Sequence, residues 1–413
     1  MRPQESLERW EERAAAAAAR GLLATSDAME NRLLAWRKDP GVAIFPLTAT
    51  FEIQGGLDRD RLAKAWAGVV ARHRILRLRP VLGEDGGVWL REAEPPAMRF
   101  DGQDRDLRGT DPFRDSLVDA HCRPVAEGHL LRLQISHLLV DAYSMTLVVK
   151  ELAARYNDPS ADLGEATDFT TWAAEEREYL RSAEAEEDAD WWRGALNRDS
   201  ARQSVLTGLE RGASHEVRRA LPDELAGQVR RAEENRVTGY SLMLTALAAT
   251  LRGDRSEAGL VVTTSFGRRL TMADYATVGC LTSRTLIPVQ SVGVASLDAV
   301  AGVQRQLWEA LEHSRLPYAW IRHAAWPDRG NLLDADPEVP YFALNETWKG
   351  GLVLEGLETR GVERRSVRSA DTFELWVEQL PTGYELTTRG PYAEGTLRAL
   401  QDEVVERLGA TFG

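Results

Sequence analysis

The chain has 413 residues, of which 43% are hydrophobic and 28% charged, a composition typical of a globular protein long enough for two domains. Its net charge of −13 argues against nucleic acid or an anionic membrane as the main partner. The sequence has no membrane-spanning stretch and no signal-peptide plan, and two widely spaced cysteines form no disulfide framework. We therefore expect a cytoplasmic monomer.

Strand and helix patterns alternate in the first part of the chain. An alanine run after several glutamates indicates a surface helix near the N-terminus, and Asp58 is a candidate cap for a helix that ends near His73. We expect strands at residues 43–54, at residues 75–82 and in the segment that ends at His137. A helix is expected over residues 144–156.

An acidic segment, residues 172–190, is interpreted as a solvated helix face that joins two lobes. The second lobe repeats the mixed pattern. Its expected helices are residues 222–235, 241–251 and 395–408, and its expected strands are residues 260–264, 286–289, 341–345 and 373–379. The sequence thus predicts a mixed α/β (α+β) protein with lobes over residues 1–165 and 166–413.

The strand that ends at His137 carries the most informative motif of the chain. Leu131, Leu133 and Ile135 alternate with polar residues, so His137 continues the apolar face of the strand. Asp141 follows on the adjoining turn, before residues that repeat at helical spacing. An imidazole at a strand end, aimed into the protein and close to a carboxylate, suits a base that works in a covered channel.

Other catalytic chemistries lack their motifs. The sequence has no phosphate-binding glycine loop, no dinucleotide fingerprint and no zinc-ligand spacing. The nearest match to a nucleophile elbow, residues 239–243, lacks its second glycine and is expected to open a helix. Ser136 is adjacent to His137, but neighbouring strand residues point to opposite faces, which disfavours a Ser–His dyad.

At this motif the chain resembles a condensation domain of nonribosomal peptide synthesis, a relative of chloramphenicol acetyltransferase and the CoA-dependent acyltransferases. The family signature H-H-x-x-x-D-G stands here as Ser136-His137-x-x-x-Asp141-Ala142. Further segments similar to family motifs follow in the right order over nearly the whole chain: residues 26–34, 72–77, 168–172, 191–193, 262–268, 278–284 and 313–318.

The resemblance implies two acetyltransferase-like lobes in a V-shaped pair with a central channel and a floor segment at about residues 268–290. It implies that His137 deprotonates or orients an amine or hydroxyl that attacks a thioester carbonyl. It also implies that Asp141 is structural and pairs with an arginine, for which Arg268 is the matching candidate. We expect no bound cofactor; the substrates would be carried on phosphopantetheine of an acyl or peptidyl carrier protein, or on coenzyme A.

The departures from the family pattern define further candidate residues. Ser136 replaces the first histidine and can still support the motif by a hydrogen bond. Ala142 replaces glycine, at a cost of about 1 kcal/mol if a positive φ is needed. The candidates for the channel or substrate site are Ala142, Ser144, Ser283, Arg284 and Trp348. Cys280 is interpreted as a small floor residue rather than a nucleophile.

Three functions stay open. The first is a free-standing acyltransferase, active in trans in antibiotic-type biosynthesis, that makes an amide or ester from a carrier-bound thioester and a small-molecule amine or alcohol. The second is a degenerate module that binds carrier or tailoring proteins without catalysis, which the incomplete signature motivates. The third is a cyclase on the same fold, acting on a single tethered substrate.

Overall fold

The computed structural model describes residues 10–40, 44–196, 205–253, 259–290, 296–327, 339–346, 351–362, 370, 372–380 and 383–411. The chain divides into two compact units. Unit 1 comprises Met1–Ser182, Gly267–Thr282 and Trp348–Arg365, and unit 2 comprises Ala183–Phe266, Ser283–Thr347 and Ser366–Gly413. None of the described helices is both long and apolar enough to cross a bilayer.

The boundary between the units differs from the predicted single cut at residues 165/166. The first crossing follows Ser182, and two later segments return to unit 1. One contributes strand β11 (Glu358–Gly361), which pairs antiparallel with β1 (Pro46–Gln54). The other, Gly267–Thr282, hydrogen-bonds to the turn after His137. Pairings over such sequence separations have no local pattern, so periodicity could not predict them.

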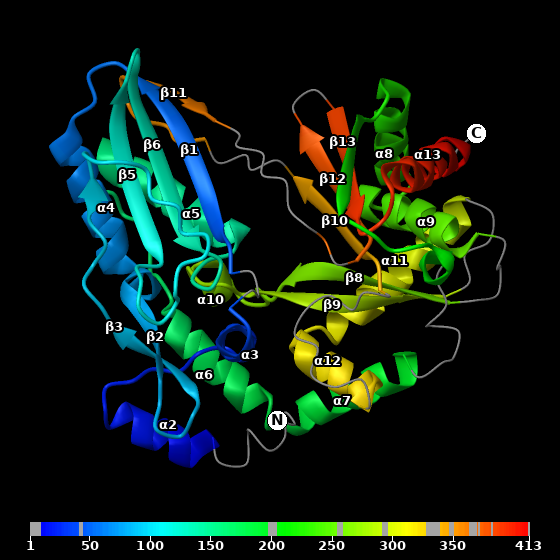
Figure 1. The fold of residues 1–413 in the computed structure, drawn as a ribbon, viewed down its shortest axis with the longest axis horizontal. Helices are drawn as coiled ribbons and strands as arrows, with labels where there is room; N and C mark the ends of the chain where they lie inside the picture. Colours follow the sequence, from blue (N-terminus) through cyan, green and yellow to red (C-terminus); the bar gives the residue numbers. More distant parts are fainter. Residues whose placement is uncertain are drawn as a thin grey trace. The chain divides into compact units, whose positions relative to one another are not determined.

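A five-stranded sheet in the order β11-β1-β6-β5-β4 forms the centre of unit 1 (Figure 1). Helices α4 and α5 pack against each other, and α5 contacts β1. A separate two-stranded sheet, β2-β3, belongs to the same unit. The remaining bounds are β2 (Leu78–Leu82), β3 (Val88–Glu92), β4 (Met98–Arg99), β5 (Val118–Val125), β6 (Gly128–Ser136), α2 (Trp10–Ala18), α3 (Asp27–Lys38), α4 (Arg59–Arg72), α5 (Ala142–Asn157), α6 (Phe169–Tyr179) and α10 (Met272–Tyr275).

Strand β6 is buried on both faces. Its apolar residues belong to the core of unit 1, as the alternation predicts. The polar residues between them are buried too, because the loop before β5 covers that face. The Gln134 side chain accepts a hydrogen bond from the Leu107 backbone at 2.8 Å, and Arg132 donates to the Arg105 carbonyl at 2.7 Å. The strand that leads to His137 is therefore held by buried contacts on both faces.

The acidic segment 172–190 forms two helices, α6 and α7 (Ala183–Leu196), and the chain passes between the units where they meet. The interpretation as a solvated face is wrong for α6, since Trp172, Glu176 and Arg177 are buried. Glu176 accepts hydrogen bonds from the Asp27 backbone and from Arg268, and Arg177 binds Glu30 at 2.7 Å. Paired charges are thus packed into unit 1, which a count of acidic residues could not reveal.

Unit 2 is built on a six-stranded mixed sheet in the order β7-β13-β12-β10-β8-β9 (Figure 1). Strand β10 runs parallel to both β8 and β12. Helix α9 is buried along its length and contacts α8, α11 and α13. The bounds are β7 (His215–Ala220), β8 (Leu260–Gly267), β9 (Thr282–Val289), β10 (Tyr341–Glu346), β12 (Glu374–Leu380), β13 (Gly383–Gly390), α8 (Asp223–Glu234), α9 (Gly239–Arg252), α11 (Leu297–Glu312), α12 (Tyr318–Ala325) and α13 (Glu394–Ala410).

Candidate active site

His137 lies one residue beyond the end of β6, in the short turn that leads into α5. Its backbone N–H donates to the Phe45 carbonyl at 3.0 Å, which extends the pairing of β6 with β1 by one residue. Ser136 Oγ accepts a hydrogen bond from the Leu138 backbone at 3.3 Å. Ser136 therefore supports the turn by a hydrogen bond, as predicted, and it does so as the acceptor.

Asp141 is the organising residue of this turn. Its carboxylate caps α5 by accepting the Ser144 backbone N–H at 2.8 Å, and it also accepts the Leu281 backbone N–H at 3.0 Å. Arg269 Nη2 lies 2.9 and 3.0 Å from the two carboxylate oxygens. Both charged side chains are almost fully buried. A buried, paired and fully hydrogen-bonded carboxylate is a scaffold and not a free base.

The arginine that pairs with Asp141 is Arg269, so the predicted pairing with Arg268 is wrong by one position. Arg268 instead forms an ion pair with Glu176, and its guanidinium lies 5.0 Å from the centre of the Trp172 ring. The two arginines follow the end of β8, where the Arg269 backbone N–H donates to the Gly267 carbonyl at 2.8 Å and the chain turns. The one-residue difference therefore decides which carboxylate each arginine meets.

Two residues predicted for the channel or substrate site have other roles or settings. Ser144 is fully buried, and its hydroxyl contacts the Gly279 backbone at 2.7 and 3.0 Å and Arg269 at 2.8 Å. Ser144 is thus part of the scaffold, and the prediction that it lines a channel is wrong.

Ala142 is exposed and is the first residue of α5. It does not adopt a positive φ, since Arg236 is the one such non-glycine among the described residues. Alanine therefore replaces glycine there without strain.

His137 is half-buried, and two side chains contact its ring. Phe45 meets it edge to face, with ring centres 5.1 Å apart, and Cys280 Sγ lies 3.5 Å from Nδ1. Burial, assisted by the positive charge of Arg32, lowers the pKa of His137, although Asp141 and ring hydrogen bonds to the backbone oppose the shift. The imidazole is therefore neutral at pH 7, the form in which it can accept a proton.

Arg32 is a neighbour of the site that the residue-level reasoning did not single out. It lies on α3, in the N-terminal segment that resembles a family motif, and its charge acts on both His137 and Cys280. In the sequence, the only feature that points to Arg32 is its place within residues 26–34, the segment similar to a family motif.

Cys280 is a neutral thiol. Burial and the negative charge of Asp141 raise its pKa to about 12. A thiol with so high a pKa is a poor nucleophile, which supports the interpretation that Cys280 is not an acyl acceptor.

The remaining predicted residues lie outside this cluster. Ser283 and Arg284 belong to unit 2, at the start of β9. Ser283 Oγ accepts a hydrogen bond from the Tyr318 backbone, and Arg284 lies over the Tyr341 ring at 5.7 Å. Trp348 falls outside the described residues. The predicted V-shape and central channel stay predictions.

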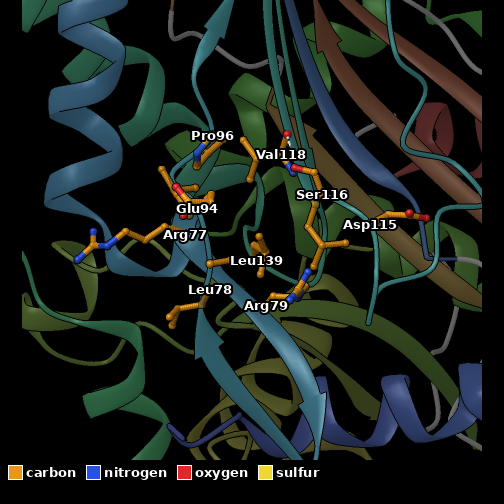
Figure 2. Close-up of a pocket in the computed structure, with 12 residues that line it drawn as sticks. Arg77, Leu78, Arg79, Glu94, Pro96, Asp115, Ser116, Val118 and Leu139 are labelled. Atoms are coloured by element: carbon orange, nitrogen blue, oxygen red, sulfur yellow. Dashed lines mark hydrogen bonds between the residues drawn. The ribbon is translucent and has the colours of Figure 1, made fainter. Parts of the chain in front are cut away.

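A pocket of about 280 Å³ lies in unit 1 beside the same turn (Figure 2). Leu139 lines it together with Leu78 and Arg79 of β2 and the segment Asp115–Val118. In Figure 2 Leu139 is drawn in the middle of the lining residues, while Asp115 points away from them. His137 is not among the lining residues, so this pocket is not the predicted catalytic channel.

The family model of the condensation domain matches residues 31–395. The chain belongs to the condensation-domain family. A phosphinothricin tripeptide synthetase from Streptomyces viridochromogenes is 26% identical over 317 residues, which are 68% of this chain and 26% of that protein. The chain spans only 4 to 26% of the length of the first curated relatives that it matches.

Solved condensation-domain structures share the fold. The condensation domain of the monacolin K polyketide synthase MokA has a TM-score of 0.76 at 16% identity and covers 94% of this chain and 96% of its own. The X-domain from teicoplanin biosynthesis has a TM-score of 0.73 at 19% identity, with 94% of both chains covered. These likenesses confirm the predicted α/β fold class, and the family model confirms the predicted family, which transfers acyl groups in nonribosomal peptide biosynthesis.

Proposed function

We propose that this condensation domain forms an amide or ester bond between a thioester-activated acyl group and an amine or hydroxyl acceptor, with His137 as the general base. The observation that carries the proposal is the state of this imidazole: it stands at a strand end, partly exposed, and its pKa is lowered. A neutral histidine can take the proton of an attacking amine or hydroxyl.

The surrounding scaffold supports this assignment. Asp141 pairs with Arg269 and accepts the Leu281 N–H, and Ser144 binds the Gly279 carbonyl. These buried hydrogen bonds hold the turn that carries His137 against the segment 278–281. Such an environment limits reorganisation when the proton moves. The two departures from the signature leave the scaffold intact, because Ser136 still braces the turn and Ala142 is unstrained.

The acyl donor in this proposal is a phosphopantetheine thioester on a carrier protein, or coenzyme A. The carrier route follows from the family, and tethering raises the effective concentration of the donor. Modest acid–base help from one histidine then suffices. The protein binds no cofactor of its own in this scheme; the thioester group arrives with the substrate.

The test is turnover with a carrier-bound acyl thioester and a small amine, followed by mass spectrometry of the product. His137→Ala should lower the rate by roughly 10²-fold or more, since that is the usual contribution of a positioned general base. His129→Ala, at the far end of the same strand, is the matched control and should keep the wild-type rate. Equal turnover by His137→Ala and wild type would remove His137 from the mechanism.

A second candidate is a non-catalytic docking module. The variant signature favours it, as does the likeness to the teicoplanin X-domain, which has also been solved in complex with OxyB. In this case the protein would bind a holo carrier protein or a tailoring enzyme, and no acyl donor and acceptor pair would give product. Carrier binding that is unaffected by His137→Ala, together with absent turnover, would favour this function over the first.

A further inference from the structure

We propose that Cys280 is a positioning residue for His137: its sulfur accepts a hydrogen bond from Nδ1–H and thereby leaves Nε2 as the basic nitrogen. This inference rests on the proposed function, because it assigns a role in preparing the base. The observation that carries it is the 3.5 Å distance between Cys280 Sγ and His137 Nδ1, which joins residues 143 positions apart in the sequence. Nothing in the family signature calls for a thiol at this place.

The backbone around Cys280 is held on both sides, which fixes where its sulfur lies. Before it, the Gly279 carbonyl accepts hydrogen bonds from the Ser144 hydroxyl at 2.7 Å and from the Asp141 backbone, and the Gly279 N–H donates to Ser144 Oγ. After it, the Leu281 N–H donates to the Asp141 carboxylate at 3.0 Å. The same carboxylate that ends the His137 turn therefore also places the thiol.

The direction of the hydrogen bond follows from where the thiol proton goes. The Cys280 S–H points to the Thr282 carbonyl, 4.0 Å away, so the sulfur lone pairs remain to accept a proton donor. A ring that donates to this sulfur carries its proton on Nδ1, the nitrogen 3.5 Å from Sγ, and leaves Nε2 without a proton.

Charged groups around the pair do not reverse this assignment. Arg32 on α3 and Asp141 at the start of α5 act on the ring with opposite signs, and Arg268 acts on the thiol. The thiol itself stays neutral, so it contributes a polarisable acceptor and not a second negative charge beside Asp141. The competing explanation is that the sulfur only fills space, in which case its removal should not alter the protonation pattern of the ring.

The two explanations are separated by the ¹⁵N chemical shifts of the His137 ring in the full-length protein, measured above the pKa of the ring. His137→Ala identifies the signals, so the measurement needs no substrate. We expect the wild type to carry its proton on Nδ1, Cys280→Ala to gain the Nε2-protonated form, and Cys280→Ser to return toward the wild type because a hydroxyl can also accept. Cys122→Ala, which removes the other thiol from the core of unit 1, should leave the pattern unchanged.

An activity measurement completes the test. Cys280→Ala should lower kcat roughly three- to tenfold, the effect expected for one modest hydrogen bond, with KM unchanged and partial recovery in Cys280→Ser. Identical ring ¹⁵N shifts in wild type and Cys280→Ala, or a wild-type proton on Nε2, would overturn the inference. If the shifts respond as expected but no acyl donor turns over, the positioning role stands and the proposed function fails.

Discussion

At the scale of single residues, the decisive interaction is the buried pair of Asp141 and Arg269. The carboxylate accepts hydrogen bonds from the backbone of Ser144 and Leu281 as well as from Arg269, so one side chain ties a helix start to a segment from the second half of the chain. Removing its charge would leave a buried guanidinium without a counterion. Such a loss is costly because the desolvation of the remaining charge is no longer offset.

We therefore expect Asp141→Asn to lower the free energy of unfolding by about 3–5 kcal/mol, measured by urea titration. Asp106→Asn is the matched control, because Asp106 pairs with Arg108 at an exposed site where an ion pair contributes about 1 kcal/mol or less. Equal losses in the two variants would show that the Asp141–Arg269 pair is not the anchor that its burial indicates.

The sequence predicted some of these residues and not others, for a physical reason. His137 and Asp141 stand in one short motif, and the strand period and the helix start that follow identify both without tertiary information. The choice of Arg269 over Arg268 depends on how the chain turns after β8, which no strand or helix period encodes. The approach of Cys280 to His137 depends on two distant segments meeting, which no local pattern encodes.

At the scale of elements, the segment Val278–Leu281 is fitted closely against unit 1. A Cβ added at Gly279 would lie 2.2 Å from a carbon of the Phe169 ring and 2.8 Å from a side-chain carbon of Leu281. Glycine is required there by close approach to α6 and not by a special backbone angle. The segment carries Cys280, so its displacement would also disturb the His137 ring.

Gly279→Ala should therefore destabilise the protein by roughly 1–3 kcal/mol, the usual cost of overpacking, with a lower midpoint in thermal or urea unfolding. Gly267→Ala provides the control, because a Cβ at Gly267 meets nothing within 4 Å. A Gly279→Ala protein as stable as the control would mean that α6 does not press against this segment.

Among the elements, those with a strong local period were predicted best. Asp58 caps α4, α5 follows the His137 turn, and the segment that lacked a nucleophile elbow opens α9 at Gly239. Residues 75–82 begin instead as a single 3₁₀ turn over Arg74–Arg77 before β2. The acidic composition of α6 was misleading because paired buried carboxylates look, in sequence, the same as solvated ones.

At the scale of the whole molecule, each unit has its own sheet and its own hydrophobic core, and the chain passes between them several times. The candidate base His137 and the residues that position it, Asp141, Arg269 and Cys280, all belong to unit 1, although Arg269 and Cys280 come from the second half of the sequence. A division at one point along the chain would have separated them. Composition and periodicity predicted only a mixed α/β protein, and the family resemblance narrowed this prediction to the condensation-domain fold.

The central claim is that a neutral His137 takes the proton of the acceptor, and the pH dependence of kcat/KM for acyl transfer tests it most directly. Because burial lowers the pKa of His137 below its ordinary value of 6.5, the base stays competent below that pH and loses activity only on further acidification, once the ring is protonated. We predict an acidic limb with its midpoint below pH 6.5 in the wild type and no such limb in the residual activity of His137→Ala. The same limb in both proteins, or a wild-type midpoint above pH 6.5, would contradict the account.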